Sequence, residues 1–321
     1  MTNDPFAQLV GQQQAIELLT QAVRQNRVAP AYLFVGPDGV GRSLAAQCFV
    51  ELLFSSFIEM RLIGSLQNRL RQGNHPALLW VQPTYQYQGQ RLTATEAAEK
   101  GLKRKAPPVI RLEQIREITQ FLSRPPLEAP RNVVVLEEAQ TMAEAAANAL
   151  LKTLEEPGQA TLILIAPTPE SVLPTLVSRC QRIPFYRLDT QSLTQVLTRT
   201  GHQELLQHQT VLSIASGSPG SAIASYEQLQ AIPPELLQNL IKPPLSYRNA
   251  LELAKKIDHD LDTEAQLWLV DYLQQHYWQH WHQSSIINQL EKARKYLLLY
   301  AQPRLVWECT LVSLCQSLGN Y

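Results

Sequence analysis

A glycine-rich turn at residues 36–43 is the segment of this chain best suited to chemistry. Its sequence, Gly36-Pro37-Asp38-Gly39-Val40-Gly41-Arg42-Ser43, fits the phosphate-binding pattern G-x-x-x-x-G-K-[ST] at all but one position. In that pattern, backbone N–H groups turn onto a phosphate, the lysine reaches the β- and γ-phosphates, and the hydroxyl holds Mg²⁺. Here the lysine is replaced by Arg42, which keeps the charge but carries a bulkier planar fork. The turn therefore predicts a degenerate nucleotide site built from Gly36, Gly39, Gly41, Arg42 and Ser43.

Two glutamates form the second candidate element of this site. Glu137 and Glu138 follow the apolar run Asn132–Leu136. Nucleotide hydrolases place there an Asp that holds Mg²⁺ and then a residue that orients the attacking water. Glu138 fits the second position, but Glu137 is one methylene longer than Asp, so we expect Glu138 to be inactive as a base. ATP or ADP with Mg²⁺ at this site is one alternative, and an empty pocket is the other; a pair of glutamates is also typical of a solvated strand end.

Short apolar runs supply the elements that must position these residues. Continuous runs of this kind are typical of strands buried on both faces, as in a parallel sheet covered by helices. The predicted strands are Ala31–Val35, Leu78–Val81, Asn132–Leu136 and Thr161–Ala166, and helical spacing marks Gly11–Asn26, Ser43–Leu53 and Leu112–Ser123.

A polar stretch at residues 82–108 interrupts this regular pattern. It contains Lys100, Lys103, Arg104 and Lys105. We interpret it as a solvated surface insertion, with contact to DNA as the alternative.

Strand patterns end near Pro184, and the rest of the chain is helical in spacing. The helical segments are Leu193–Leu206, Gln209–Ser216, Leu251–Ile257, Thr263–Trp281, Ile286–Tyr300 and Leu305–Leu318, with a turn at residues 217–220. Proline pairs at 233–234 and 243–244 suggest a boundary near residue 230. We therefore predict an α/β domain at 1–184, a small helical domain at 185–231 and a C-terminal helical domain at 232–321.

Composition excludes several classes of function. Lys plus Arg equals Asp plus Glu at 28 each, which argues against an independent DNA-binding protein but not against a share of DNA contacts in an assembly. The four cysteines form no Cys-x-x-Cys pair, so neither zinc nor a disulfide framework is expected. The N-terminus lacks a signal-peptide pattern and no apolar run is long enough for a bilayer, so we expect a cytoplasmic protein without membrane contact.

Three histidines near the end of a predicted helix are the remaining candidates for a metal site. His276, His280 and His282 alternate with Tyr277, Trp278 and Trp281, and no acidic or cysteine partner is nearby in the sequence. This composition favours a packed or surface cluster over a metal site.

Four further segments carry a resemblance to a known family. The string from Ala147 to Pro157, ANALLKTLEEP, resembles the helix after the acidic element in AAA+ clamp-loader subunits. Leu176-Val177-Ser178-Arg179-Cys180 resembles the Ser-Arg-Cys signature of the same family, and Val10-Gly11-Gln12 with Arg27–Ala31 resembles its adenine-proximal segment. The resemblance covers the α/β domain strongly, the small helical domain moderately and the C-terminal helices only by type.

Membership of that family would imply a role for Arg179 outside this chain. In the family, this arginine projects into the ATP site of the neighbouring subunit and stabilises charge on the γ-phosphate. The resemblance also implies an AAA+ fold and a pentameric ring formed with other loader subunits through the C-terminal helical domain. That ring would open a sliding clamp and place it on primer–template DNA.

Departures from the family pattern favour a subunit that does not hydrolyse ATP itself. They are Arg42, Glu137, and Ser221 in place of the arginine that follows a Gly-Ser-x-x turn in hydrolysing relatives. Residues 49–75 contain no cysteine, so the zinc module common in the family is expected to be lost. The alternative is a working AAA+ ATPase, either a motor subunit or a DNA-branch remodeller, which the intact glycines, Ser43 and Glu138 would support.

Overall fold

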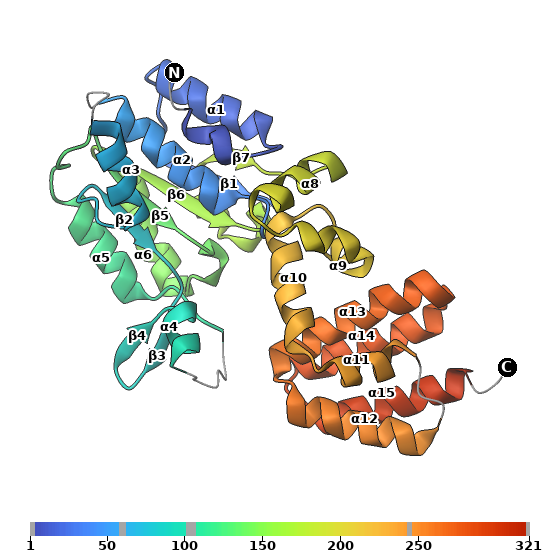
Figure 1. Cartoon of the computed structure of the whole chain (residues 1–321). Helices are drawn as coiled ribbons and strands as arrows, with labels where there is room; N and C mark the ends of the chain where they lie inside the picture. The colour runs from blue at the N-terminus through green and yellow to red at the C-terminus, as the bar shows by residue number, and fades with distance from the viewer. Residues whose placement is uncertain (1–3, 58–61, 101–106, 243–245, 319–321) are drawn as a thin grey trace. The chain divides into compact units, whose positions relative to one another are not determined.

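The computed structural model describes residues 4–57, 62–100, 107–242 and 246–318 (Figure 1). The chain divides into two compact units, Met1–Arg187 and Leu188–Tyr321. The first boundary predicted from the sequence, 184/185, lies three residues before this division.

The first unit is built on a parallel sheet of five strands in the order β2-β5-β6-β1-β7. This confirms the predicted α/β class, and four of the strands match the predicted apolar runs to within one residue. The strands are β1 (Ala31–Val35), β2 (Leu78–Val81), β5 (Asn132–Leu136), β6 (Ala160–Ala166) and β7 (Gln181–Pro184).

Side chains from alternate positions of each strand pack into two hydrophobic cores, one on each face of the sheet. In β1, Tyr32 and Phe34 enter one core, whereas Ala31 and Leu33 enter the other. The first core is covered by the 3-10 helix η1 (Pro5–Gln8) with α1 (Gln13–Arg24), α2 (Arg42–Ser55) and α3 (Ile63–Arg71). The second is covered by α5 (Leu112–Leu122), α6 (Glu144–Glu155) and α7 (Pro174–Val177).

The edge strand β7 was missed by the sequence patterns. Of its four residues, Ile183 alone is buried, because the strand has a neighbour on one side only. A segment with one buried residue shows neither a continuous apolar run nor a clear alternation.

The polar insertion is more ordered than the sequence predicts. Within it, a hairpin of β3 (Tyr85–Tyr87) and β4 (Gln90–Leu92) precedes α4 (Ala94–Glu99), elements that the sequence patterns did not indicate. The hairpin turns at Gln88 and Gly89, both at positive φ, and such turns suit the twist of a two-stranded ribbon. Of the four basic residues, Lys100 lies in the described part, and Lys103, Arg104 and Lys105 fall outside the described residues.

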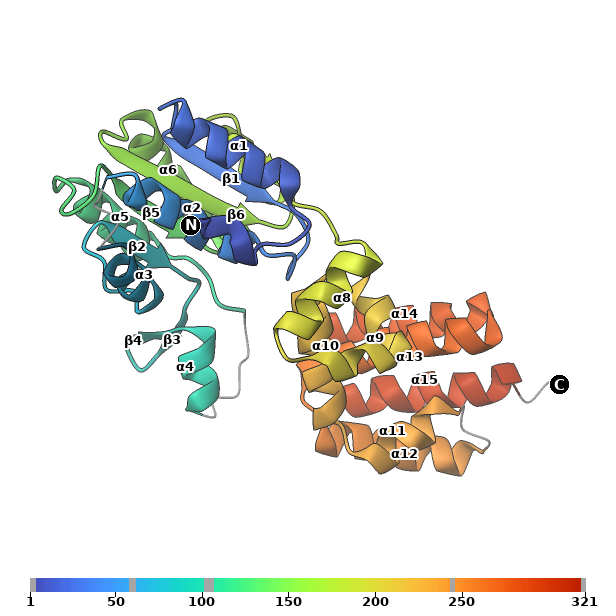
Figure 2. The same ribbon diagram turned by 45° about the horizontal axis from the view of Figure 1, so that its top comes forward.

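The second unit is helical (Figure 2). Its elements are α8 (Thr190–Arg199), η5 (Gln203–Gln207), α9 (Gln209–Ala215), α10 (Pro219–Ala231), α11 (Pro234–Ile241), α12 (Tyr247–Asp260), α13 (Thr263–Trp281), α14 (Ser284–Leu298) and α15 (Pro303–Leu318). Buried apolar residues form a small cluster between positions 188 and 222 and a larger one between 232 and 314.

Two sequence-based expectations for this unit need correction. The predicted helix Leu193–Leu206 ends at Arg199, because Gly201 at φ +80° breaks it before η5. The predicted turn at residues 217–220 is shorter than expected, because Gly217 lies in a turn but α10 already begins at Pro219. The Ser218 hydroxyl accepts from the N–H of Ser221, and Pro219 takes the first helical position, where its missing N–H costs nothing. No helix in the described ranges has the length and apolar character needed to cross a bilayer.

Candidate functional site

The glycine turn connects β1 to α2, as the phosphate-loop pattern predicts. Two of its glycines are required by close approach of the surrounding chain. A Cβ on Gly36 would lie 2.4 Å from the carbonyl oxygen of Phe185, and one on Gly41, at φ +103°, would lie 2.8 Å from Cδ1 of Leu9. Gly36 and Gly41 are therefore explained by packing even before a phosphate is considered.

Arg42 is held by a partner from its own loop. The side chain is buried, with the residue 8% exposed, and its Nη2 forms an ion pair with the Asp38 carboxylate. Its Nη1 is also buried and has no hydrogen-bond partner among the described residues. Ser43 lies half-buried in the first turn of α2. The charge that replaces the lysine is thus already partly neutralised.

The two glutamates have different surroundings. The Gln82 amide donates to Oε2 of Glu137 at 2.7 Å. Gln82 follows β2, and β2 lies on the other side of β5 from β6 and β1. Glu138 sits at φ +48° within electrostatic range of Asp38 and Arg42. Partial withdrawal from water and the charges of Asp38 and Glu137 raise the pKa of Glu138, and Arg42 opposes the rise. Glu138 thus lies within electrostatic range of the loop residues Asp38 and Arg42, whereas Glu137 is hydrogen-bonded to Gln82.

A buried glutamine that was not predicted as a site residue ties the loop to the end of β7. The Gln12 amide nitrogen donates to the carbonyls of Val40 at 3.2 Å and Tyr186 at 2.7 Å. Its oxygen accepts from the Tyr186 N–H at 3.1 Å. In the sequence, Gln12 belongs to the Val10-Gly11-Gln12 segment that carries the family resemblance, but its role in joining the loop to β7 appears only from its contacts.

The Ser-Arg-Cys segment follows α7, and its three side chains have different environments. The Ser178 hydroxyl donates to the Thr175 carbonyl at 3.0 Å, and Cys180 packs against the core, where burial raises the pKa of its thiol to about 11. Arg179 is exposed: its Nη2 donates to Oε1 of Glu155 at 2.8 Å and its Nη1 to the Thr175 carbonyl at 3.0 Å.

Arg179 and the glycine turn lie at opposite ends of the parallel strands β1 and β7. The turn follows the carboxyl end of β1, whereas Arg179 precedes the amino end of β7, which pairs with β1 in parallel. The four residues of β7 span about 13 Å. This topology keeps Arg179 away from the nucleotide loop of its own chain.

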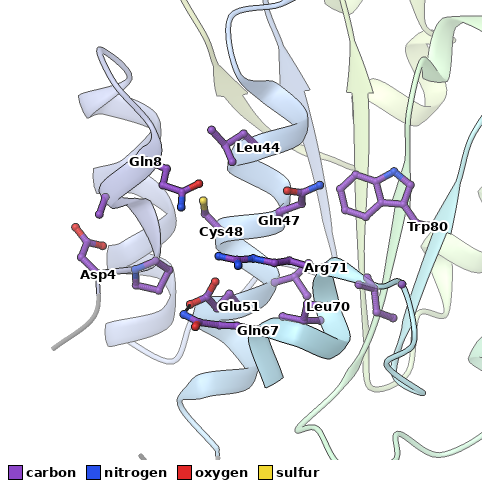
Figure 3. Close-up of a pocket in the computed structure, with 15 residues that line it drawn as sticks. Asp4, Gln8, Leu44, Gln47, Cys48, Glu51, Gln67, Leu70, Arg71 and Trp80 are labelled. Carbon is purple, nitrogen blue, oxygen red and sulfur yellow. Dashed lines mark hydrogen bonds between the residues drawn. The ribbon is translucent and has the colours of Figure 1, made fainter. Parts of the chain in front are cut away.

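A pocket lies on the outer face of α2, between η1, α3 and β2 (Figure 3). Its cavity measures about 340 Å³. Asp4 and Glu51 oppose Arg71 in its lining, and Glu51 accepts from the Gln67 amide at 2.7 Å. With both signs of charge present, the lining favours neither an anion nor a cation.

The three histidines lie at the C-terminal end of α13 and at its C-cap, His282. His276 is buried, its ring centre lies 4.2 Å from that of His280, and Trp278 stacks on His282. Burial and the nearby His280 lower the pKa of His276. The described residues contain no group of three or more His, Cys, Asp or Glu side chains arranged to hold a metal ion.

Comparisons with known proteins point to one family. The model "DNA polymerase III, delta subunit" matches residues 11–189, and "Cyanobacterial DNA polymerase III delta prime, C-terminal domain" matches residues 191–314. The chain is 31% identical over 185 residues to DNA polymerase III subunit delta′ of Bacillus subtilis, covering 57% of this chain and 50% of that protein. It is 33% identical over 202 residues to the delta′ subunit of Pseudomonas aeruginosa, covering 60% and 55%. The chain thus spans about half the length of the curated relatives it matches.

A solved structure shares the fold. The DNA polymerase III gamma subunit-related protein of Thermotoga maritima aligns with a TM-score of 0.52 at 17% identity, covering 94% of this chain and 99% of that one.

Proposed function

This chain belongs to the DNA polymerase III delta-subunit family as a delta′-type member of the clamp-loader group, and from this we propose how it works. It acts as an accessory subunit that helps to load a sliding clamp onto primed DNA. It supplies Arg179 to the ATP site of a neighbouring subunit and hydrolyses no ATP itself. We propose that it acts in the cytoplasm, where the chromosome is replicated.

The position of Arg179 is the observation that carries this proposal. An arginine at the amino ends of the parallel strands cannot reach the phosphate loop at their carboxyl ends. Its side chain is 39% exposed, so a second subunit can approach it. A guanidinium that stabilises charge on a transferring phosphoryl group raises the rate by about 10³- to 10⁵-fold.

The state of the nucleotide loop supports the second part of the proposal. Arg42 is paired with Asp38, and Glu137, at the metal-holding position, is engaged by Gln82. A Mg²⁺–ATP complex would have to displace both partners. The chain's own site is therefore proposed to contribute shape rather than catalysis.

The partners follow from the family. We propose a pentameric ring with motor and delta-type loader subunits, joined through the C-terminal helical domain, that acts on the clamp and on primer–template DNA. Homologues named DNA polymerase III subunit tau from Bacillus subtilis and Escherichia coli match this chain at 25% and 26% identity, which supports partners of the same fold.

The test is ATP turnover by the reconstituted loader with Arg179→Ala. With partner ATPase subunits, clamp and primed DNA present, we expect turnover at the site that receives this arginine to fall by about 10³-fold or more. The matched control is Arg116→Ala, which removes an exposed arginine from α5 and should leave turnover unchanged.

Unchanged turnover with Arg179→Ala would refute the trans-acting role. ATP hydrolysis by the purified chain alone, abolished by Glu138→Gln, would favour the alternative of an active AAA+ ATPase.

A further inference from the structure

The ion pair between Glu155 and Arg179 joins the two family motifs across 24 residues of sequence. Glu155 is the last residue of α6, and Arg179 follows the short helix α7. The helices α6 and α7 pack against the same core, so the distance between their ends is fixed by the fold. The pair is therefore a property of the tertiary structure and not of either motif alone.

Glu155 occupies a position that does not suit a carboxylate. The C-terminal end of a helix carries the negative end of the helix dipole, which favours cations and disfavours anions. Glu156 follows directly and adds a second negative charge at the same helix end. The helix alone thus gives no reason for an acid at position 155, whereas Arg179 does.

The hydrogen bonds of Arg179 do not use all of the N–H donors of its guanidinium group. A guanidinium has five N–H donors, and within the described residues the hydrogen bonds to Glu155 and to the Thr175 carbonyl use two of them. The two acceptors limit the rotamers of a side chain that otherwise has many. An exposed ion pair of this kind is weak, so it does not hold the guanidinium back from a phosphate.

We propose that Glu155 is a positioning residue that orients Arg179 towards the ATP site of the neighbouring subunit. This inference rests on the proposed function of Arg179. Glu155 touches no nucleotide; it acts by fixing one nitrogen of the guanidinium, so that little conformational freedom remains to be lost when the neighbouring γ-phosphate binds.

The test uses the complete reconstituted loader with clamp and primed DNA. We expect Glu155→Ala to lower the kcat for ATP by about 2- to 5-fold, where the upper limit corresponds to the strongest exposed ion pairs of this kind. The KM for ATP should stay unchanged, because the neighbouring subunit binds the nucleotide. Glu155→Gln should restore most of the kcat, because its amide oxygen can still accept the bond from Nη2.

Two further variants make the test specific. Glu156→Ala removes the same charge from the adjacent residue and should leave turnover unchanged. The double variant Glu155→Ala/Arg179→Ala should turn over ATP no more slowly than Arg179→Ala, because a positioning residue has no effect once its target is gone. The thermal midpoint of Glu155→Ala should match that of the unmodified chain, since the pair is exposed.

The outcomes separate the two proposals. If Arg179→Ala lowers turnover and Glu155→Ala leaves it equal or higher, the positioning role is overturned and the finger stands. A loss of equal size in Glu156→Ala, or a double variant slower than Arg179→Ala, also overturns positioning, because the effect then comes from charge or from another contact. If Arg179→Ala itself has no effect, the proposed function fails and this inference fails with it.

Discussion

At the scale of single residues, charge placement decides what the glycine turn can do. Asp38 pairs with Arg42, and Glu138 carries a raised pKa because it is partly withdrawn from water and lies near Asp38 and Glu137. A polyphosphate would bring further negative charge to a place where like charges already oppose one another. The one buried donor without a partner among the described residues of this loop, Nη1 of Arg42, belongs to a guanidinium that is already paired with Asp38.

Nucleotide titration tests this residue-scale view. We expect Mg²⁺–ATP at about 1 mM to leave the thermal midpoint of the isolated chain unchanged, because a ligand stabilises a protein only by RT ln(1 + [L]/Kd). A partner ATPase subunit, treated in the same way, should show a clear increase. An increase of several degrees in this chain would contradict a non-binding pocket and support a nucleotide that is bound without hydrolysis.

At the scale of elements, a buried tyrosine joins two helices of the second unit. The Tyr277 hydroxyl on α13 donates to the carbonyl of Leu240, near the end of α11. The ring is almost fully buried, and this burial raises the pKa of Tyr277. The bond satisfies a helix-end carbonyl that would otherwise be buried without a partner.

Removing this hydroxyl should weaken the packing of α11 on α13. We expect Tyr277→Phe to lower the free energy of unfolding by about 1–3 kcal/mol, because the Leu240 carbonyl then stays unpaired. Urea unfolding measures the change. A variant as stable as the unmodified chain would show that water reaches the carbonyl.

The same tyrosine gives a stability dependence on pH with a definite sign. Because the pKa of Tyr277 in the folded chain lies above its ordinary value of 10.0, the unfolded state loses this proton first as pH rises. The contribution of Tyr277 to stability is then fully present below pH 10 and falls above it. Tyr277→Phe should make this decline shallower, whereas the part due to Tyr272, whose pKa is also raised, remains.

At the scale of the whole molecule, each of the two compact units has buried apolar clusters of its own. The first unit holds the two cores on either face of the sheet, and the second holds the clusters of residues 188–222 and 232–314. A segment that buries its own apolar surface does not need the rest of the chain to fold.

A fragment of residues 188–321 should therefore fold by itself. We expect helical circular dichroism and a cooperative thermal transition, because the larger cluster, centred on Trp307, lies wholly within it. The control is a fragment of residues 232–321, which lacks the cluster of residues 188–222 and two apolar residues, Ile214 and Leu229, that pack on the larger one. A fragment of residues 188–321 without a cooperative transition would show that the units depend on one another.

The sequence by itself determined the features that depend on neighbouring positions. Continuous apolar runs predicted four strands and the parallel sheet, because a strand buried on both faces must be apolar at every residue. The glycine spacing identified the loop between β1 and α2, and the Ser-Arg-Cys motif identified Arg179 as a candidate. The substitution at Arg42 predicted a degenerate site, although it gave no partner for the new guanidinium.

Only the tertiary structure decided which distant residues meet. The amide of Gln12 hydrogen-bonds to the segment that follows β7, Gln82 hydrogen-bonds to Glu137, and Arg179 pairs with Glu155. In each case, tens of residues separate the two partners in the sequence. The tertiary structure also decided that β7 is a strand, since its hydrogen bonds to β1 do not require an apolar pattern at an edge. The physical reason is the same in each case: a local pattern records which face of an element is buried, whereas a hydrogen bond between separate elements depends on how the whole chain packs.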